Sequence, residues 1–184
     1  MDTGESSYRR FLDGDDYGME ELVRDYKDGL LLYLNSFINN IYIAEDCVQD
    51  TFIKLAVKKP KFRGDSSFKT WLYKIGRNIA ISNIRKNSKR NDTLIDECEN
   101  ISADTDIERD YLHEEQKITV YKAMNKLKMD YQQVLYLTYF EGFSNTETAK
   151  IMKKSRKQIE NLLYNAKKYL KSELEKEGLH YEGL

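Results

Sequence analysis

An acidic segment divides this chain into two basic parts. Asn91 to Glu115 carry ten Asp or Glu residues against one Arg, whereas Lys61 to Arg90 carry nine Lys or Arg against one acid, and Lys150 to Lys171 carry eight against one. The acidic segment has no sustained apolar periodicity and has the charge of a solvated linker. We therefore expect two separate folded parts, each with its own small core.

The sorting of charge also constrains the ligand. The formal net charge of -1 conceals two cationic blocks, whereas a merely soluble protein would intersperse its signs. Two basic blocks indicate two surfaces for one polyanion, and nucleic acid is the obvious candidate.

Composition predicts an all-α fold. Among 184 residues there are one proline and nine glycines, and a third of the residues are charged, which favours helices and leaves apolar material for two small bundles rather than one large core. Periodicity predicts helices over Asp16–Phe37, Ile43–Val57 and Ser67–Asn87, and again between Tyr111 and Leu174. We place the first domain at 7–90, the acidic linker at 91–112 and the second domain at 113–176.

The helix predicted from Ser67, which is its expected N-cap, has two faces. Trp71, Leu72 and Ile75 fall within one arc, and Lys74, Arg77 and Arg85 lie nearly opposite. The position of Trp71 favours core packing over stacking on a base, and Phe62 and Phe68 are suited to anchoring the preceding loop. Tyr73 is the better candidate for stacking.

The carboxy-terminal pattern predicts a helix-turn-helix. Ser144 and Glu147 form a capping box before the first helix, and the spacing of Ala149 and Ile159 suits two short helices that pack closely. Lys153 stands where such turns commonly carry glycine, which requires a less favoured backbone conformation or a modified turn. The alternative reading is an ordinary helical hairpin with a solvated basic side.

Several other classes of protein are not expected. The most apolar stretch, Gly29 to Ala44, is interrupted by three asparagines and is too short to cross a bilayer. No export signal is apparent at the amino terminus, so we expect a cytoplasmic protein without membrane insertion. Cys47 and Cys98 are far apart and belong to no CxxC motif, so neither a zinc site nor another cofactor is expected.

With both basic parts in view, the chain resembles the extracytoplasmic-function (ECF) sigma factors, group 4 of the sigma-70 family. AEDCVQDTFIKL (Ala44–Leu55) is similar to the family's polymerase-binding helix. FRGDSSFKTWLYKIGRNIAISNIRK (Phe62–Lys86) is similar to its loop and helix for the promoter −10 element, and GFSNTETAKIMKKSRKQIENLLYNAKKYL (Gly142–Leu170) to its −35 reader. Three motifs in this order are far more specific than any one of them.

The resemblance implies sigma2-like and sigma4-like helical domains and three sets of site residues. Asp46, Gln49 and Asp50 would bind the clamp helices of the largest polymerase subunit, although a solvated helix face is the alternative. The −10 set, in which Asn78 would contact a base edge, is Arg63, Gly64, Asp65, Ser66, Tyr73, Lys74, Arg77, Asn78 and Arg85. The −35 set is Arg156, Lys157, Gln158, Glu160, Asn161, Tyr164, Asn165, Lys167 and Lys168.

In the −35 reader the chain departs from the family. Glu160, Asn161 and Leu162 stand where the family usually has a basic residue followed by Ser-Arg. Glutamate can accept from cytosine and asparagine can pair with adenine, which predicts an unusual −35 sequence. Leu162 could equally be additional core, and one arginine fewer could mean weaker contact.

The function implied is promoter recognition without catalytic chemistry. The partners would be core RNA polymerase, including its beta flap, and promoter DNA. Sequestration by an anti-sigma factor is common in the family, but no residue of this sequence requires it. A dimeric helix-turn-helix regulator that acts without polymerase is the main alternative. A nuclease would use Asp46 and Asp50, or acids of the linker, as metal ligands, but no histidine or convergent acidic set at suitable spacing supports this class.

Overall fold

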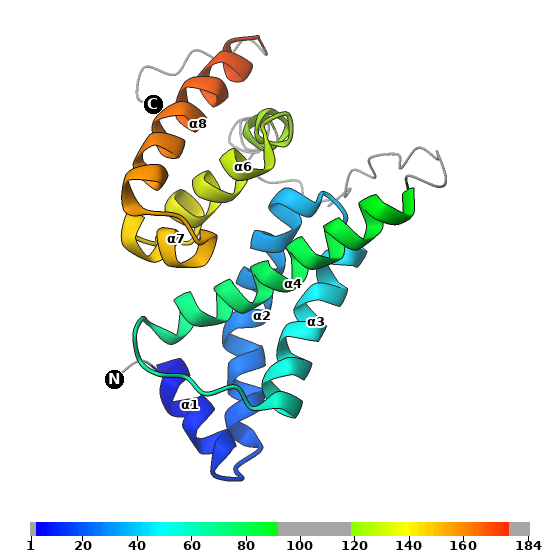
Figure 1. Ribbon diagram of the computed structural model, residues 1–184, viewed down its shortest axis with the longest axis vertical. Helices are drawn as coiled ribbons and strands as arrows, with labels where there is room; N and C mark the ends of the chain where they lie inside the picture. The colour runs from blue at the N-terminus through cyan, green and yellow to red at the C-terminus, as the bar shows by residue number, and fades with distance from the viewer. Residues whose placement is uncertain (1–2, 92–118, 177–184) are drawn as a thin grey trace, which may run out of the picture.

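The computed structural model describes residues 3–91 and 119–176, and every regular element in these ranges is helical (Figure 1). The first part contains α1 (Thr3–Leu12), α2 (Tyr17–Ile38), α3 (Ile41–Lys58) and α4 (Phe68–Asn91). The second part is helical over 119–125 and continues with α6 (Met129–Leu135), the π-helix η1 (Tyr136–Phe140), α7 (Asn145–Met152) and α8 (Arg156–Lys176). The predicted all-α class is confirmed.

The amino-terminal bundle is organised around α2, which packs against α1, α3 and α4. Leu30, Tyr33 and Leu34 of α2 are fully buried, as the three- and four-residue apolar spacing predicted. Helix α2 ends where Asn39 adopts a left-handed conformation, with φ of 54°. Asn40 then caps α3, because its side chain accepts a hydrogen bond from the backbone N–H of Ile43 at 3.1 Å.

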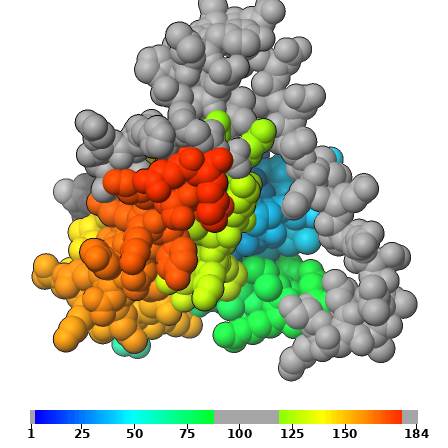
Figure 2. Space-filling view, turned by 90° about the horizontal axis from the view of Figure 1, so that it is seen from above, coloured from blue at the N-terminus to red at the C-terminus, as the bar shows by residue number. Residues whose placement is uncertain are grey.

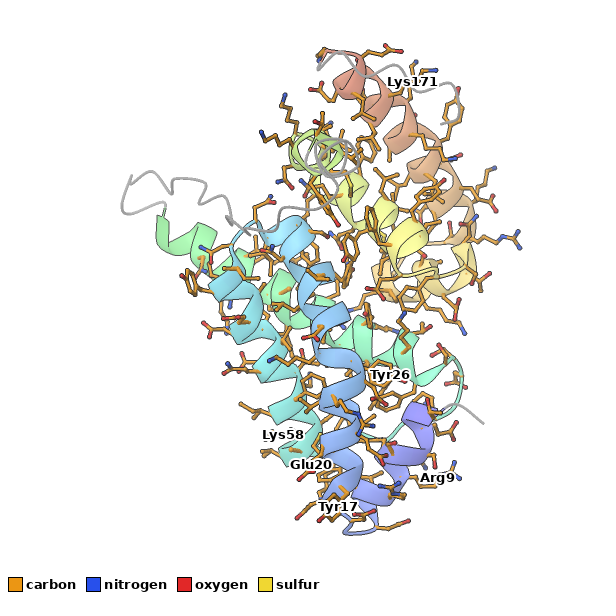
Figure 3. The ribbon with its side chains drawn as sticks, turned by 180° about the vertical axis from the view of Figure 1, so that it is seen from behind. Arg9, Tyr17, Glu20, Tyr26, Lys58 and Lys171 are labelled. Atoms are coloured by element: carbon orange, nitrogen blue, oxygen red, sulfur yellow. The ribbon has the colours of Figure 1, made fainter. Side chains whose placement is uncertain are left out.

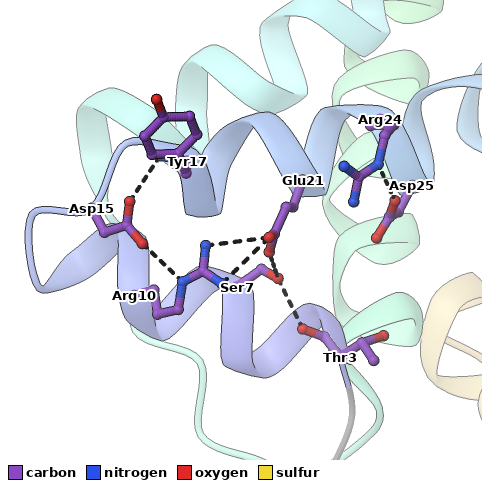
Figure 4. A network of polar contacts seen from close by, with 8 residues as sticks. All are labelled: Thr3, Ser7, Arg10, Asp15, Tyr17, Glu21, Arg24 and Asp25. Carbon is purple, nitrogen blue, oxygen red and sulfur yellow. Dashed lines mark hydrogen bonds and ion pairs between the residues drawn. The ribbon is translucent and has the colours of Figure 1, made fainter.

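Helix α1 is a separate element that sequence periodicity did not delimit. A polar network fixes it to α2 and to the turn before α2 (Figure 4): Ser7 Oγ donates to Glu21 at 2.7 Å, and Arg10 Nε donates to Asp15 of the turn at 2.9 Å. The phenol of Tyr8 donates to the carbonyl of Pro60 at 2.8 Å, and burial raises its pKa to about 12. These contacts bring α1 beside the segment that leads into α4.

The carboxy-terminal helix-turn-helix forms as predicted. Ser144 Oγ accepts from the backbone N–H of Glu147 at 3.3 Å, and Glu147 accepts from the N–H of Ser144 at 3.0 Å, so the capping box is present. Lys153 adopts the left-handed conformation, with φ of 55°, where a glycine would be unstrained. A second reciprocal cap, between Ser155 and Gln158, starts α8.

The two bundles are in contact. Helix α7 packs on α4, and α6 and η1 pack on α2; Figure 2 shows α6 beside the exposed parts of α2 and α4, with α8 on the other side of α6. Buried residues of both parts form one continuous apolar cluster. The acidic segment is predicted to separate the domains as a linker over 91–112, and its residues from 92 onward lie outside the described ranges. The contact between the bundles was not predicted from the sequence.

Candidate nucleic-acid interface

Helix α3 presents a mixed acidic and apolar surface to solvent. Asp46, Gln49 and Asp50 are exposed, whereas Cys47 and Val48 are buried beneath them. None of the three exposed residues has a hydrogen-bond or ion-pair partner within residues 3–91 and 119–176. Their carboxylate and amide groups are therefore available to a partner.

Two apolar residues extend this surface toward the end of α3. Ile53 is 56% exposed and Val57 is 69% exposed, and they follow Asp46 and Asp50 at helical spacing. Sequence reasoning missed them, although large apolar residues on the polar side of a helix are the signal that could have found them. We call Asp46, Gln49, Asp50, Ile53 and Val57 the α3 outer face.

The loop before α4 is held by a cluster of aromatic rings. Phe62, Phe68 and Trp71 contact one another with centroids 5.3–5.7 Å apart, and Tyr8 contacts Phe68 and Trp71 at 5.5 Å. The predicted packing role of Trp71 and anchoring role of the two phenylalanines are confirmed.

Between these anchors the loop residues of the −10 set face outward. Arg63, Gly64 and Asp65 are exposed and Ser66 is half-buried. Gly64 has a φ of 76°, a backbone conformation that residues other than glycine rarely adopt. The loop thus presents a fixed polar edge next to the start of α4.

The α4 residues of the −10 set divide into two groups. Lys74 and Asn78 are half-buried and Arg85 is exposed. Tyr73 is 1% exposed and Arg77 is 9% exposed, because the carboxy-terminal bundle covers both and the Tyr73 ring also stacks on Tyr33 of α2. Helical projection placed Arg77 on a free cationic side, and this side is occupied in the structure.

A polar groove of about 500 Å³ lies between α3 and α4. It brings together Asp50 of the α3 outer face and Asn78. Asn83 and Asn87 also line it; Asn87 Nδ2 donates to Asn83 Oδ1 at 2.9 Å, and Asn83 Nδ2 donates to Cys47 Sγ at 3.7 Å. Sequence reasoning missed both asparagines, whose spacing of four residues from each other was the available signal.

The contact between the bundles is polar and aromatic. Glu141 accepts from Lys69 Nζ at 2.8 Å and from the Tyr73 hydroxyl at 2.9 Å. Burial, with a smaller contribution from Glu141, raises the pKa of Tyr73 far above its ordinary value, so the hydroxyl stays protonated and donates. Arg77 Nε donates to Gln133 Oε1 at 2.6 Å. We call Lys69, Tyr73 and Arg77 with Gln133 and Glu141 the interdomain contact.

The exposed side of α8 carries the −35 set. Only Lys167 is half-buried, with its ammonium 5.2 Å from the ring centroid of Tyr139, and Tyr164 is 72% exposed. The remaining members of the set are exposed: Arg156, Lys157, Gln158, Glu160, Asn161, Asn165 and Lys168. We call these nine residues the α8 outer face.

Local contacts already modify this face. Glu160 pairs with Arg156 at 2.9 Å, which neutralises one cation near the start of the helix. The Gln158 side chain accepts from the N–H of Ser155 at 2.7 Å, so it also caps the helix. Leu162 is half-buried and packs against the core.

Two other kinds of site were sought in the described residues. Within 3–91 and 119–176, no group of three or more His, Cys, Asp or Glu side chains is placed to hold a metal ion. No helix in these ranges is long and apolar enough to cross a membrane.

Comparison with known proteins identifies both halves of the chain. Residues 22–90 match the family model of sigma-70 region 2, and residues 117–170 match that of sigma-70 region 4. RNA polymerase sigma factor YlaC of Bacillus subtilis is 34% identical over 160 residues, which cover 86% of this chain and 92% of the relative. ECF RNA polymerase sigma factor SigW of the same organism is 26% identical, with 88% and 91% covered.

Among solved structures, the sigma factor RpoE from Bartonella quintana, in complex with the anti-sigma factor NepR, is 26% identical. It superposes with a TM-score of 0.69 over 85% of this chain and 96% of that one. These matches, together with the two helical bundles and their exposed faces, show that the chain belongs to the sigma-70 family of RNA polymerase sigma factors, in its extracytoplasmic-function class.

Proposed function

We propose that this sigma factor divides promoter recognition between its two bundles and carries out no chemistry itself. The −35 duplex would be read by a domain spanning 113–176, the −10 element by a domain spanning 7–90, and 91–112 would connect them. The observation that carries the proposal is the separation of exposed faces: the α8 outer face lies on one bundle and the α3 outer face and loop Arg63–Ser66 on the other.

The α8 outer face suits a major groove. A helix of a helix-turn-helix inserts its amino-terminal residues among base edges while cations beside them contact phosphates. Asn161 and Tyr164 are exposed at the centre of the face, and Lys168 lies one turn further along. Since Glu160 is paired with Arg156, a cytosine amino group would have to compete with the guanidinium for this carboxylate.

The loop before α4 and the helix itself suit an unpaired strand. Such a strand needs cations for its phosphates and a fixed polar edge for an extruded base. Arg63, Lys74 and Arg85 supply accessible or half-buried cations, and Asn78 stands at the groove next to α3. Selective binding of the melted state would draw the promoter toward the open complex.

The α3 outer face would dock on the clamp helices of the largest polymerase subunit, and the carboxy-terminal bundle on the beta flap. Exposed carboxylates beside Ile53 and Val57 provide the charged and apolar components that protein interfaces combine. The protein would act in the cytoplasm, with polymerase. Since the relative from Bartonella quintana was solved with an anti-sigma factor, we include such a partner in the proposal.

Run-off transcription tests the proposal directly. A library of randomised promoters is transcribed by bacterial core polymerase with and without the purified protein, and the RNA start sites are sequenced. We expect new start sites that share sequence elements near −35 and −10. If the protein binds specific duplex DNA tightly by itself and leaves start sites unchanged, it acts as a regulator of the dimeric helix-turn-helix kind.

A further inference from the structure

The interdomain contact lies on the part of α4 that the proposed function assigns to the promoter strand. Lys69, Tyr73 and Arg77 follow one another at four-residue intervals, so they form one stripe along the helix. All three donate hydrogen bonds to the carboxy-terminal bundle. A strand phosphate cannot reach this stripe while the bundle is in place.

Glu141 occupies the position that a phosphate would take. Its carboxylate pairs with Lys69 Nζ at 2.8 Å and accepts a hydrogen bond from the Tyr73 hydroxyl at 2.9 Å. Its backbone carbonyl accepts a hydrogen bond from Lys69 Nζ at 3.2 Å. An anionic oxygen held by an ammonium and a hydroxyl is the same arrangement by which proteins hold DNA backbones. The ammonium also lies 4.8 Å from the ring centroid of Phe143.

Arg77 contacts the carboxy-terminal bundle through a neutral side chain rather than through an anion. Arg77 is buried, and its Nε donates to the neutral amide of Gln133. The Nε2 of that amide is buried without a partner in residues 3–91 and 119–176. A buried amide donor without a partner costs free energy, and a neutral acceptor binds a guanidinium less strongly than an anion does. A phosphate would be a better partner for Arg77 than Gln133 is.

The start of α7 covers the loop in the same way. Glu147 accepts from Thr70 Oγ1 at 3.2 Å, and Lys150 donates to the backbone carbonyl of Asp65. By contrast, the α3 outer face and most of the α8 outer face remain exposed. The closed arrangement therefore covers Lys69, Tyr73 and Arg77, whereas the rest of the −10 set and the polymerase and duplex surfaces stay exposed or half-buried.

We propose that the carboxy-terminal bundle is an intramolecular competitor of the unpaired promoter strand, with Glu141 standing in for a phosphate. The strand then reaches Lys69, Tyr73 and Arg77, and binds at full strength, only after the bundles separate. This inference depends on the proposed −10 role of α4.

Gly29 of α2 offers a way to open the contact without changing any charge. A Cβ at this position would lie 2.6 Å from the Tyr73 hydroxyl and 3.3 Å from Glu141 Oε1, so Gly29→Ala must displace the pair. Alanine also favours the helix over glycine, which protects the fold of α2. The exposed residue Asp28 on the same helix provides the matched control, Asp28→Ala.

The experiment uses the full chain and two readouts. Small-angle X-ray scattering measures the radius of gyration, and fluorescence anisotropy measures binding of a labelled single-stranded DNA of mixed sequence, roughly 12 nucleotides long. Loss of a charge-assisted hydrogen bond changes an equilibrium about tenfold. We expect Gly29→Ala to increase the radius of gyration and to tighten strand binding by about tenfold, with Asp28→Ala unchanged. Glu141→Gln should act in the same direction, whereas Glu175→Gln, an exposed carboxylate of α8, should not.

The outcomes separate this inference from the proposed function. If Gly29→Ala and Glu141→Gln leave both readouts at wild-type values, the proposed competition is refuted. If Asn78→Ala still weakens binding of the single strand in that case, the −10 role of α4 stands. If the variants open the molecule and strand affinity does not rise, the competition is also overturned. In that case unchanged run-off transcription by Asn78→Ala would show that the −10 role itself was misassigned.

Discussion

Reversing the charge of the α3 outer face should detach this sigma factor from polymerase and leave its fold intact. Asp46 and Asp50 are exposed and have no partner in the described parts of the chain. Surface substitutions away from structural contacts usually change the free energy of unfolding by less than about 0.5 kcal/mol. The variant Asp46→Lys with Asp50→Lys should therefore unfold at nearly the wild-type temperature.

The expected loss of binding follows from the two charges. Removing one partner of a close charge pair at an interface costs about 2–5 kcal/mol. Two pairs at the lower value give about 4 kcal/mol, which corresponds to a roughly thousandfold weaker Kd for core polymerase. Repulsion between the new lysines and a basic docking surface would add to this loss.

Biolayer interferometry with immobilised bacterial core polymerase measures the Kd, and circular dichroism monitors unfolding. The matched control is Glu20→Lys with Asp28→Lys, which reverses two exposed carboxylates on α2. Figure 3 shows Glu20 at the end of the amino-terminal bundle away from α8. If the α3 variant binds as tightly as this control, the α3 outer face is not the polymerase site.

Three further substitutions test the DNA sites and the helix-turn-helix. Asn78→Ala should reduce permanganate reactivity of the open complex at least tenfold while changing the gel-shift affinity for −35 duplex less than twofold, since a lost base contact costs about 1–3 kcal/mol; equal losses would show that the module is misassigned. Lys153→Gly should raise the free energy of unfolding by about 0.5–1 kcal/mol, measured by urea titration, because glycine relieves the left-handed φ of 55°. Burial raises the pKa of Glu147, but hydrogen bonds from Ser144 and Thr70 outweigh burial and lower the pKa below its ordinary value of 4.5. The ionised Glu147 side chain therefore contributes fully to stability well above pH 4.5, and this contribution is lost as the pH falls through the lowered pKa. The stability penalty of Glu147→Gln should accordingly stay constant above about pH 5.5 and shrink as the pH falls from about 5 through the lowered pKa, and a penalty that does not shrink there would contradict this.

Sequence could predict the parts of the fold that local interactions decide. The apolar spacing of α2 and the Ser144–Glu147 capping box are set within a few residues, and the structure reproduces both. For Lys153 the sequence left two alternatives, a less favoured backbone conformation or a modified turn, and the structure shows the first. Helix α1 was not predicted, because its contacts to Glu21 and Pro60 join residues that are 14 and 52 positions apart in the sequence.

The same reasoning explains the candidate site. Exposed residues such as Asp46 and Asn161 follow from the polar side of a single helix, and the structure leaves them exposed. Tyr73 and Arg77 also lay on the side away from the amino-terminal core, but their partners are 68 and 56 residues further along the chain. A helical projection describes one helix and cannot show that another bundle packs against it.

The spacing of promoter elements gives an independent reason for the bundles to separate. Elements centred near −35 and −10 are about 25 base pairs apart, which is about 85 Å of duplex at about 3.4 Å per base pair. In the closed form α7, which is joined to α8, packs on α4, so one molecule cannot contact both elements. The roughly 27 residues between Asn91 and Thr119 could extend to about 90 Å, enough for each bundle to reach its element. Contact with both elements thus requires the opening that also frees Lys69, Tyr73 and Arg77, and strand capture at full strength becomes conditional on the −35 module having left α4.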